Sequence, residues 1–377
     1  MKKIITIILV FSFILILLAG CGGSNDSDVG ISDNRILKIG VLISSPSETL
    51  GIEYANFTTP TVEIEGAVYE IELVFVDNPF TEETSSIAQM FVDQGVSVII
   101  SSCESAAEMM ADDVFRESGL AVIGISNIGL PDSANYFRMY HPNPFGGQAL
   151  ANFAIEHFDA ERAYILANLG DDCGTEFAAY FIEAFDRENV IYEIFPSGIS
   201  DFTPYILSAK EADAQILFTP VSEKYANLII SQTYSEGLHI PILASDDWRF
   251  ASLDEALGKN IEIYISTLYK EGGSPQFDTG FRDFVSLSAS DSGYDSDIDK
   301  ITDIIVTGYE AYFAAIQAVA SAGSLYPNYV RTVLSHIVFN SIISGDVMFN
   351  ENNVAKRSLV FIKSFNTQTN EWELITV

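Results

Sequence analysis

Polar side chains that could hold a small charged molecule recur directly after short apolar runs. Serine hydroxyls, asparagine amides and aspartate carboxylates are groups with which binding sites orient a polar ligand. They occur in Ser44-Ser45-Pro46-Ser47, Asp77-Asn78, Ser101-Ser102-Cys103-Glu104-Ser105, Ser126-Asn127, Gly170-Asp171-Asp172-Cys173-Gly174, Pro220-Val221-Ser222 and Ser245-Asp246-Asp247-Trp248. If the apolar runs are parallel strands, these loops lie at the carboxyl ends of the strands, where open α/β sheets bind ligands. The recurrence therefore predicts a ligand-binding edge.

Each of these residue types also has a common structural role that involves no ligand. A serine before a helix is commonly its N-cap, an Asp-Asp pair in a loop is commonly solvated, and Trp248 is commonly part of a core. The repetition of such loops over the whole chain favours binding more than any one residue does.

The sequence contains no recognisable motif for catalysis or metal binding. It has no Gly-x-Ser-x-Gly elbow, and its four histidines, His141, His157, His239 and His336, lie far apart without metal-ligand spacing. We therefore predict no catalytic residue, no metal and no cofactor, and a surface hydrolase is the least favoured function.

The composition indicates a large folded protein that avoids polyanions. Of 377 residues, 48% are hydrophobic and 12% aromatic, enough for the cores of two domains. The formal net charge of −33 repels nucleic acid and anionic lipid headgroups. A nucleic-acid partner is therefore not expected.

The amino terminus resembles a bacterial lipoprotein signal. Lys2 and Lys3 precede an apolar run over 4–18, which is shorter than the ~20 residues of a membrane-spanning helix. The run ends in Leu18-Ala19-Gly20-Cys21, similar to a lipobox. The resemblance implies a signal peptide over 1–20 and a lipid on Cys21 that anchors the protein to the outside of the cell membrane. An ordinary secretory signal with a chance cysteine is the alternative.

The residues after Cys21 are small, polar and acidic, which is typical of a flexible tether over 21–35. Beyond it, apolar runs that suit buried parallel strands alternate with helical patterns. The predicted strands are 37–43, 71–77, 96–101, 120–125, 163–167, 191–195, 214–219, 240–244 and 261–267, and the predicted helices are 81–94, 106–117, 145–158, 175–188, 205–211 and 224–236. This rhythm predicts an α/β protein with doubly wound parallel sheets.

The last third of the chain departs from this rhythm. A long helix is predicted over 300–323 and a second over 326–340, and the tail from 347 reads as short strands or a hairpin. Near the amino terminus, only about 20 residues separate the Ser44–Ser47 loop from the second strand, so the first helix is expected to be nearly absent.

With these segments in order, residues 36–377 resemble the type I periplasmic binding proteins, closest to the leucine/isoleucine/valine-binding receptors of ABC importers. The segments that carry the resemblance are LKIGVLI over 37–43, IELVFVDN over 71–78, GVSVIISS over 95–102, YFRM over 136–139, SDDW over 245–248 and GYEA over 308–311. The resemblance implies two lobes joined by three hinge crossings, near 140–143, 266–270 and 341–346. Lobe one is then 36–142 plus 268–342, and lobe two 143–267 plus 343–377.

The resemblance also implies ligand-binding residues. It places the ligand carboxylate at Ser102, Cys103 and Ser105, the ligand ammonium at Ile125, Ser126, Asn127 and Asp246, and further contacts at Ser45, Cys173, Val221 and Trp248. Cys173 stands where relatives carry a tyrosine, and Glu104 lies inside the carboxylate loop. A cleft with Glu104, Asp172 and Asp246 would also suit a cationic or neutral ligand. Cys103 and Cys173 are expected as free thiols, or bridged only in a closed form.

The function that follows is a non-enzymatic receptor. It captures a small polar metabolite, an amino acid or a similar compound, and delivers it to an ABC permease. The same fold also suits a sensor subunit that presents its bound state to a membrane kinase or chemoreceptor. The resemblance implies a monomer.

Overall fold

Two α/β lobes, each built on its own sheet, make up the part of the chain that the structure describes. The computed structural model describes residues 35–43, 49–77, 84–102, 105–125, 133–139, 144–292 and 303–375. Residues 1–34, which include the predicted signal, Cys21 and the predicted tether up to its last residue, lie outside the described residues. The predicted class, doubly wound α/β lobes, is confirmed.

The first sheet has the strand order β2-β3-β1-β4-β5-β6, and all its neighbours are parallel except the β2–β3 hairpin. Its strands are β1 (Ile36–Ile43), β2 (Thr61–Ile64), β3 (Ala67–Asp77), β4 (Val98–Ser101), β5 (Val122–Gly124) and β6 (Tyr136–Arg138). Its central strands are apolar on both sides because helices cover both faces of the sheet.

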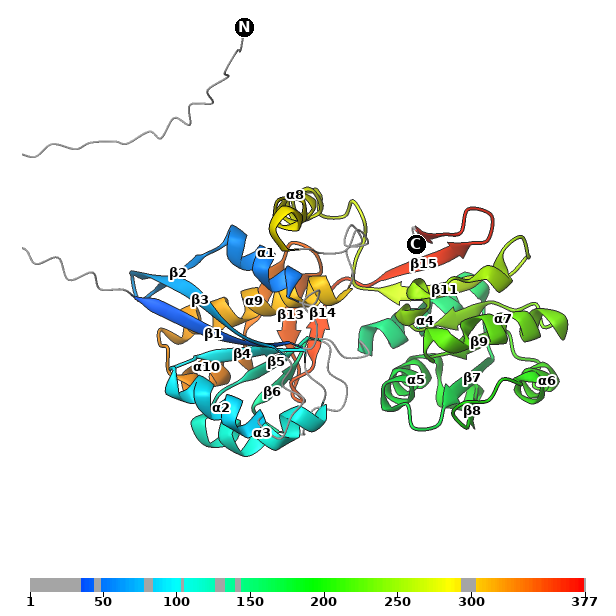
Figure 1. The fold of residues 1–377 in the computed structure, drawn as a ribbon. Helices are drawn as coiled ribbons and strands as arrows, with labels where there is room; N and C mark the ends of the chain where they lie inside the picture. Colours follow the sequence, from blue (N-terminus) through cyan, green and yellow to red (C-terminus); the bar gives the residue numbers. More distant parts are fainter. Residues whose placement is uncertain are drawn as a thin grey trace, which may run out of the picture. The chain divides into compact units, whose positions relative to one another are not determined.

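The helices of this lobe divide between those two faces (Figure 1). They are α1 (Leu50–Thr58), α2 (Thr84–Asp93), α3 (Ser105–Ser118), α8 (Pro275–Ser292), α9 (Asp303–Ala322) and α10 (Pro327–Leu334). Phe91 of α2 and Phe115 of α3 share one core with Ile99. Tyr54 of α1 and Tyr312 of α9 share the opposite core with Ile100. α9 is long and apolar enough to cross a membrane, but 72% of its most apolar window is buried, as in a core helix.

The second sheet has the order β16-β15-β11-β10-β9-β7-β8. Five strands are parallel: β7 (Ala163–Asn168), β8 (Val190–Phe195), β9 (Ile216–Thr219), β10 (Ile242–Ala244) and β11 (Ile263–Thr267). The antiparallel strands β15 (Phe361–Asn366) and β16 (Glu371–Leu374) extend one edge. Around it lie α4 (Pro144–Phe158), α5 (Asp172–Phe185), α6 (Thr203–Glu211), α7 (Ala226–Ser235) and the short 3₁₀ helices η2 (Arg187–Asn189), η3 (Glu223–Tyr225), η4 (Asp246–Phe250) and η5 (Asp254–Ala256).

Three predicted elements need correction. The first helix is not nearly absent: α1 has 9 residues, and the edge strand β2 follows it. The helix predicted over 326–340 ends at Leu334, because Val338–Ser341 pairs instead with Gly345–Phe349. α8, which the sequence analysis did not predict, covers part of the first lobe's core through Phe277 and Phe281.

A small antiparallel sheet also changes the predicted lobe boundary. It consists of β12 (Val338–Ser341), β13 (Gly345–Phe349) and β14 (Ala355–Arg357). Val347, Phe349 and Ala355 are buried in the first lobe's core, so assigning 343–357 to the second lobe is wrong. After β14 the chain next joins the second sheet at β15.

A buried ion pair holds this small sheet to the first lobe. Arg357 Nε donates to Glu310 Oε2 at 2.9 Å, and Arg357 Nη2 donates to the carbonyl oxygen of Met139 at 2.8 Å. The side chains of Arg357 and Glu310 are 2% and 0% exposed. Breaking such a pair leaves one charge buried without compensation, which is costly.

We predict that Arg357→Met lowers the free energy of unfolding by about 3–5 kcal/mol, because Glu310 then keeps an unpaired charge in the core. The matched control is Arg282→Met, since Arg282 pairs with Glu271 at 2.7 Å but both side chains are exposed. That change should cost less than about 1 kcal/mol. Urea denaturation measures both, and equal losses would contradict the assignment.

Candidate ligand-binding site

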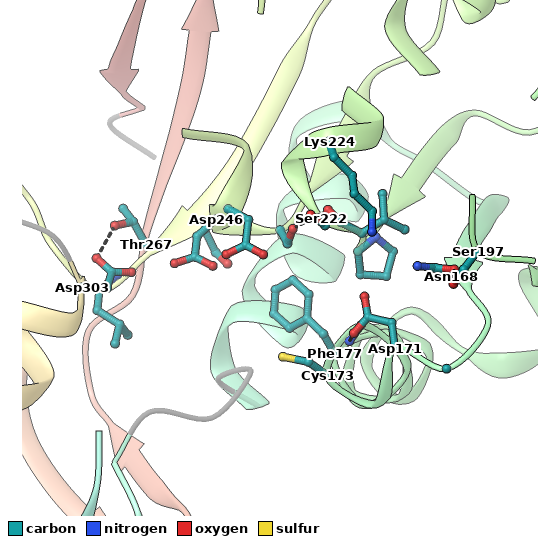
Figure 2. A pocket seen from close by; sticks show the side chains of 18 of the residues that line it. Asn168, Asp171, Cys173, Phe177, Ser197, Ser222, Lys224, Asp246, Thr267 and Asp303 are labelled. Atoms are coloured by element: carbon teal, nitrogen blue, oxygen red, sulfur yellow. Dashed lines mark hydrogen bonds between the residues drawn. The ribbon is translucent and has the colours of Figure 1, made fainter. Parts of the chain in front are cut away.

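A cavity of about 500 Å³ lies at the carboxyl ends of the second sheet's parallel strands (Figure 2). Its lining residues lie at or just after the ends of β7, β8, β9, β10 and β11, with Asp303 of α9 and Val360 added from elsewhere in the chain. The lining residues are Asn168, Gly170, Asp171, Cys173, Gly174, Phe177, Ser197, Pro220, Val221, Ser222, Lys224, Ser245, Asp246, Asp247, Ser266, Thr267, Leu268, Asp303 and Val360. The cavity thus lies at the polar strand-end edge at which the sequence predicts ligand binding.

The loop after β7 is held by a helix cap and a close backbone approach. Asp171 is the N-cap of α5, and its Oδ1 accepts from the Gly174 N–H at 2.9 Å. A Cβ on Gly174 would lie 2.2 Å from the Pro220 carbonyl oxygen, so only glycine fits there. This contact brings Cys173 and Phe177 against the loop after β9.

Trp248 and Ser245 fix the opposite wall. The Trp248 Nε1–H and the Ser245 hydroxyl both donate to the Val221 carbonyl oxygen, each at 3.0 Å. Trp248 is fully buried in the second lobe's core and does not line the cavity. The structure therefore gives Trp248 a positioning role behind the wall, in place of the predicted ligand contact.

A charged network joins the cavity to α9. Arg249 Nη1 donates to Asp303 Oδ1 at 2.9 Å, and Arg249 Nη2 lies 3.6 Å from Asp246 Oδ2. Asp303 also accepts from the Thr267 hydroxyl at 3.0 Å and the Leu268 N–H at 3.2 Å. Thr267 and Leu268 lie where the chain leaves β11, at the predicted second crossing, so the network joins the binding loop, the crossing and α9.

The two carboxyl groups on either side of Arg249 have opposite proton affinities. Burial raises the pKa of Asp246 to about 8; Arg249 opposes this shift, and Asp303 and Asp247 add to it. For Asp303, burial also favours the neutral form, but Arg249 and the bonds from Leu268 and Thr267 outweigh it and lower its pKa. Asp303 is thus the carboxyl group that favours the ionised form. A cation bound beside Asp246 would stabilise its ionised form and lower its pKa.

The acidic surroundings also raise the pKa values of two further groups, Asp247 and Cys173. Burial, then Glu223 and Asp171, raises the pKa of Asp247 against the opposing effect of Arg249. Cys173 is a free thiol, and burial together with Asp171, Asp247 and Asp246 raises its pKa far above the usual range. The thiol is therefore neutral and a poor nucleophile at physiological pH.

Of the residues predicted from the resemblance, Cys173, Val221 and Asp246 line this cavity. Asp172, also expected in the cleft, is exposed, and its neighbour Asp171 takes that place. Cys21, Ser45, Cys103, Glu104, Ser126 and Asn127 lie outside the described residues.

Three predicted residues belong to the first lobe. Ser102 is buried directly after β4, and Ser105 begins α3. Ile125 is buried after β5, and its carbonyl oxygen accepts from the Thr307 hydroxyl at 3.2 Å. None of the three lines the cavity described above.

Sequence reasoning missed Asp303, Arg249, Thr267 and Lys224. Asp303 and Thr267 are separated by 36 residues and meet only through the fold. Arg249 did have a signal, since it follows SDDW at a spacing of three from Asp246 on a short helix.

The comparisons with known proteins agree with this architecture. The family model described as periplasmic binding protein matches residues 50–368. A Leu/Ile/Val-binding protein homolog of Brucella suis is 23% identical, over 88% of each chain. A leucine binding protein from Thermotoga maritima has a TM-score of 0.63 at 21% identity, covering 91% of this chain and 98% of that one. A solute binding protein from R. palustris, solved with 4-hydroxybenzoate, has a TM-score of 0.67 at 16% identity, over 91% and 96%.

The chain therefore belongs to the periplasmic binding protein family, and its fold is that of the type I, leucine/isoleucine/valine-binding-like members. The predicted class, a solute-binding protein rather than an enzyme, is confirmed by these relatives. Membership also implies action outside the cytoplasm, as predicted.

The raised pKa of Asp246 gives a test on the ligand-free protein. Between about pH 4 and pH 8 the folded state keeps this proton whereas the unfolded state loses it, so the free energy of unfolding falls as pH rises through this range. Asp246→Asn removes this loss. We predict that the free energy of unfolding of Asp246→Asn relative to wild type rises by at least about 1 kcal/mol between pH 5 and pH 8, against a ceiling of about 1.4 kcal/mol per pH unit.

Urea denaturation at several pH values measures this difference. Asp172→Asn, which removes an exposed carboxylate outside the cavity, should show no such trend. A difference between Asp246→Asn and wild type that is flat, or falls with pH, would contradict the assignment.

Proposed function

We propose that the protein captures a small polar metabolite, an amino acid or a similar compound, and delivers it to an ABC import permease. The observation that carries the proposal is the cavity at the strand ends with the half-buried Asp246 at its wall. The names of its relatives support an amino acid, since one is a Leu/Ile/Val-binding protein homolog and another a leucine binding protein.

The ligand ammonium is proposed to bind Asp246. A cation within hydrogen-bond distance would offset the burial that now favours the protonated carboxyl group. Phe177 and Pro220 supply an apolar wall for the ligand's carbon chain, and Ser222 and Ser245 supply hydroxyl groups.

The ligand carboxylate is proposed to bind the first lobe after β4. Ser102 directly follows β4, and Ser105 is the first residue of α3, a helix of 14 residues. The first turn of a helix offers free N–H groups and a positive dipole end, which favours an anion. Cys103, Ile125, Ser126 and Asn127 complete the proposed first-lobe contacts.

Ligand capture is proposed to close the lobes by hinge motion. We place the crossings at 140–143, 266–270 and 358–360, so that lobe one is 36–139 plus 268–357 and lobe two 144–267 plus 361–375. The network of Arg249, Thr267 and Asp303 lies at the second of these crossings.

The protein is further proposed to act as a lipid-anchored monomer. The segment Leu18-Ala19-Gly20-Cys21 supports lipidation of Cys21, and the polar residues after it supply a tether. Fully extended, the 13 residues over 22–34 would reach roughly 40 Å, enough for the folded lobes to meet a permease in the same membrane.

The first experiment is a thermal-shift screen of amino acids, amides, polyamines and nucleosides on the purified mature protein. A ligand at a hundredfold excess over its dissociation constant stabilises the fold by about 2.7 kcal/mol. We predict that an amino acid or a close analogue raises the melting temperature and that nucleosides do not.

The second experiment tests Asp246. Asp246→Ala should weaken binding of the amino acid found in the screen by at least about 30-fold, because a buried charge partner is worth 2 kcal/mol or more. Calorimetry measures the affinity, and Asp172→Ala is the matched control. Unchanged affinity in Asp246→Ala would overturn the amino-acid proposal.

A further inference from the structure

The charges around the cavity do not balance. Among the described residues that line it, four are aspartates and Lys224 is the one cation. Arg249, which lies behind the lining, bonds to Asp303 at 2.9 Å and reaches Asp246 only at 3.6 Å. Asp303 is therefore compensated, whereas Arg249 reaches Asp246 and Asp247 less directly, and Lys224 is the one cation that lines the cavity beside Asp171, Asp246 and Asp247.

Lys224 compensates these carboxylates weakly. Its side chain is exposed and its Nζ lies 4.9 Å from the centre of the Tyr225 ring, whereas Asp171, Asp246 and Asp247 are half-buried. Charges in water are screened, but charges in a partly closed cavity act on one another at lower effective dielectric. The exposed Glu223 next to Lys224 adds another negative charge.

Asp247 is the least satisfied of the three carboxylates. No hydrogen bond or ion pair joins it to another described residue, whereas Asp171 caps α5 through Oδ1 and Asp246 faces Arg249. Asp171, Asp247 and Asp246 all act on the Cys173 thiol, which places the three carboxyl groups around the same part of the cavity. Figure 2 shows Cys173, Phe177 and Asp171 together on this part of the wall.

The wall there suits a chain with a charged end. Phe177 and Pro220 offer an apolar surface for methylene groups, and the small side chain of Cys173 lines the same cavity. A neutral apolar ligand would leave Asp247 half-buried and unpaired, which is costly. A ligand with a second cation would pair with it.

We propose that the ligand carries a second cationic group besides its α-ammonium, held by Asp247 and Asp171 around Cys173, so that the site takes a basic amino acid rather than a branched-chain one. This inference rests on the proposed function, in which Asp246 holds the α-ammonium. It adds a second subsite within the same cavity.

Two pairs of amino acids test it by calorimetry. Lysine is compared with norleucine, which lacks the ε-amine, and arginine with citrulline, its neutral counterpart. At least one cationic member should bind tenfold or more tightly than its neutral partner. In Asp247→Asn that ratio should fall at least fivefold, and in Asp172→Asn, which changes an exposed carboxylate outside the cavity, it should not change.

The other outcomes separate the two proposals. If norleucine, citrulline or leucine binds as tightly as the cationic amino acids, the second subsite is wrong while amino-acid capture stands. If the cationic member binds more tightly but its affinity ratio to the neutral member is unchanged in Asp247→Asn, the assignment to Asp247 is wrong. If no amino acid binds, the proposed function fails and this inference falls with it.

Discussion

Arg249 lies between two carboxyl groups that it cannot satisfy equally. At 2.9 Å it bonds to Asp303 of α9, which Thr267 and Leu268 also hold, and at 3.6 Å it faces Asp246 in the cavity. A single guanidinium therefore links the binding loop to a helix of the first lobe. Because the positive charge of Arg249 interacts mainly with Asp303, Asp246 has no close cation of its own in the empty cavity. The acidity of the cavity, and the ligand class we infer, follow from this unequal sharing.

Most of the fold was predictable because the parallel strands of both sheets are apolar on both faces and are followed by amphipathic helices. Gly95, Gly119 and Gly237, which follow α2, α3 and α7, have positive φ, as glycines at helix C-termini commonly do. The errors lie where pairing between distant segments overrides local preference. Val338–Ser341 reads as the end of a helix, but pairing with Gly345–Phe349 makes it a strand. This sheet buries Val347 and Phe349 in the first lobe's core.

The site was predictable only as a set of loops. Position after a strand identified Cys173, Val221 and Asp246, because topology brings those loops to one sheet edge. Which of two adjacent aspartates faces the cavity was not predictable: Asp171 lines it and Asp172 is exposed, since the N-cap geometry of α5 turns the first toward Gly174. Asp303 lies on another lobe's helix, and no local pattern connects it to Asp246.

The central claim is that Asp246 is protonated in the empty site and releases its proton to the solvent when an ammonium group binds. With a pKa of about 8 before binding, it should release most of one proton at pH 7 when a cation binds. Calorimetry of the ligand in buffers with different ionisation enthalpies measures this number. The account predicts a release of more than half a proton that disappears in Asp246→Asn. No proton release from the wild-type protein, or the same release from the variant, would contradict it.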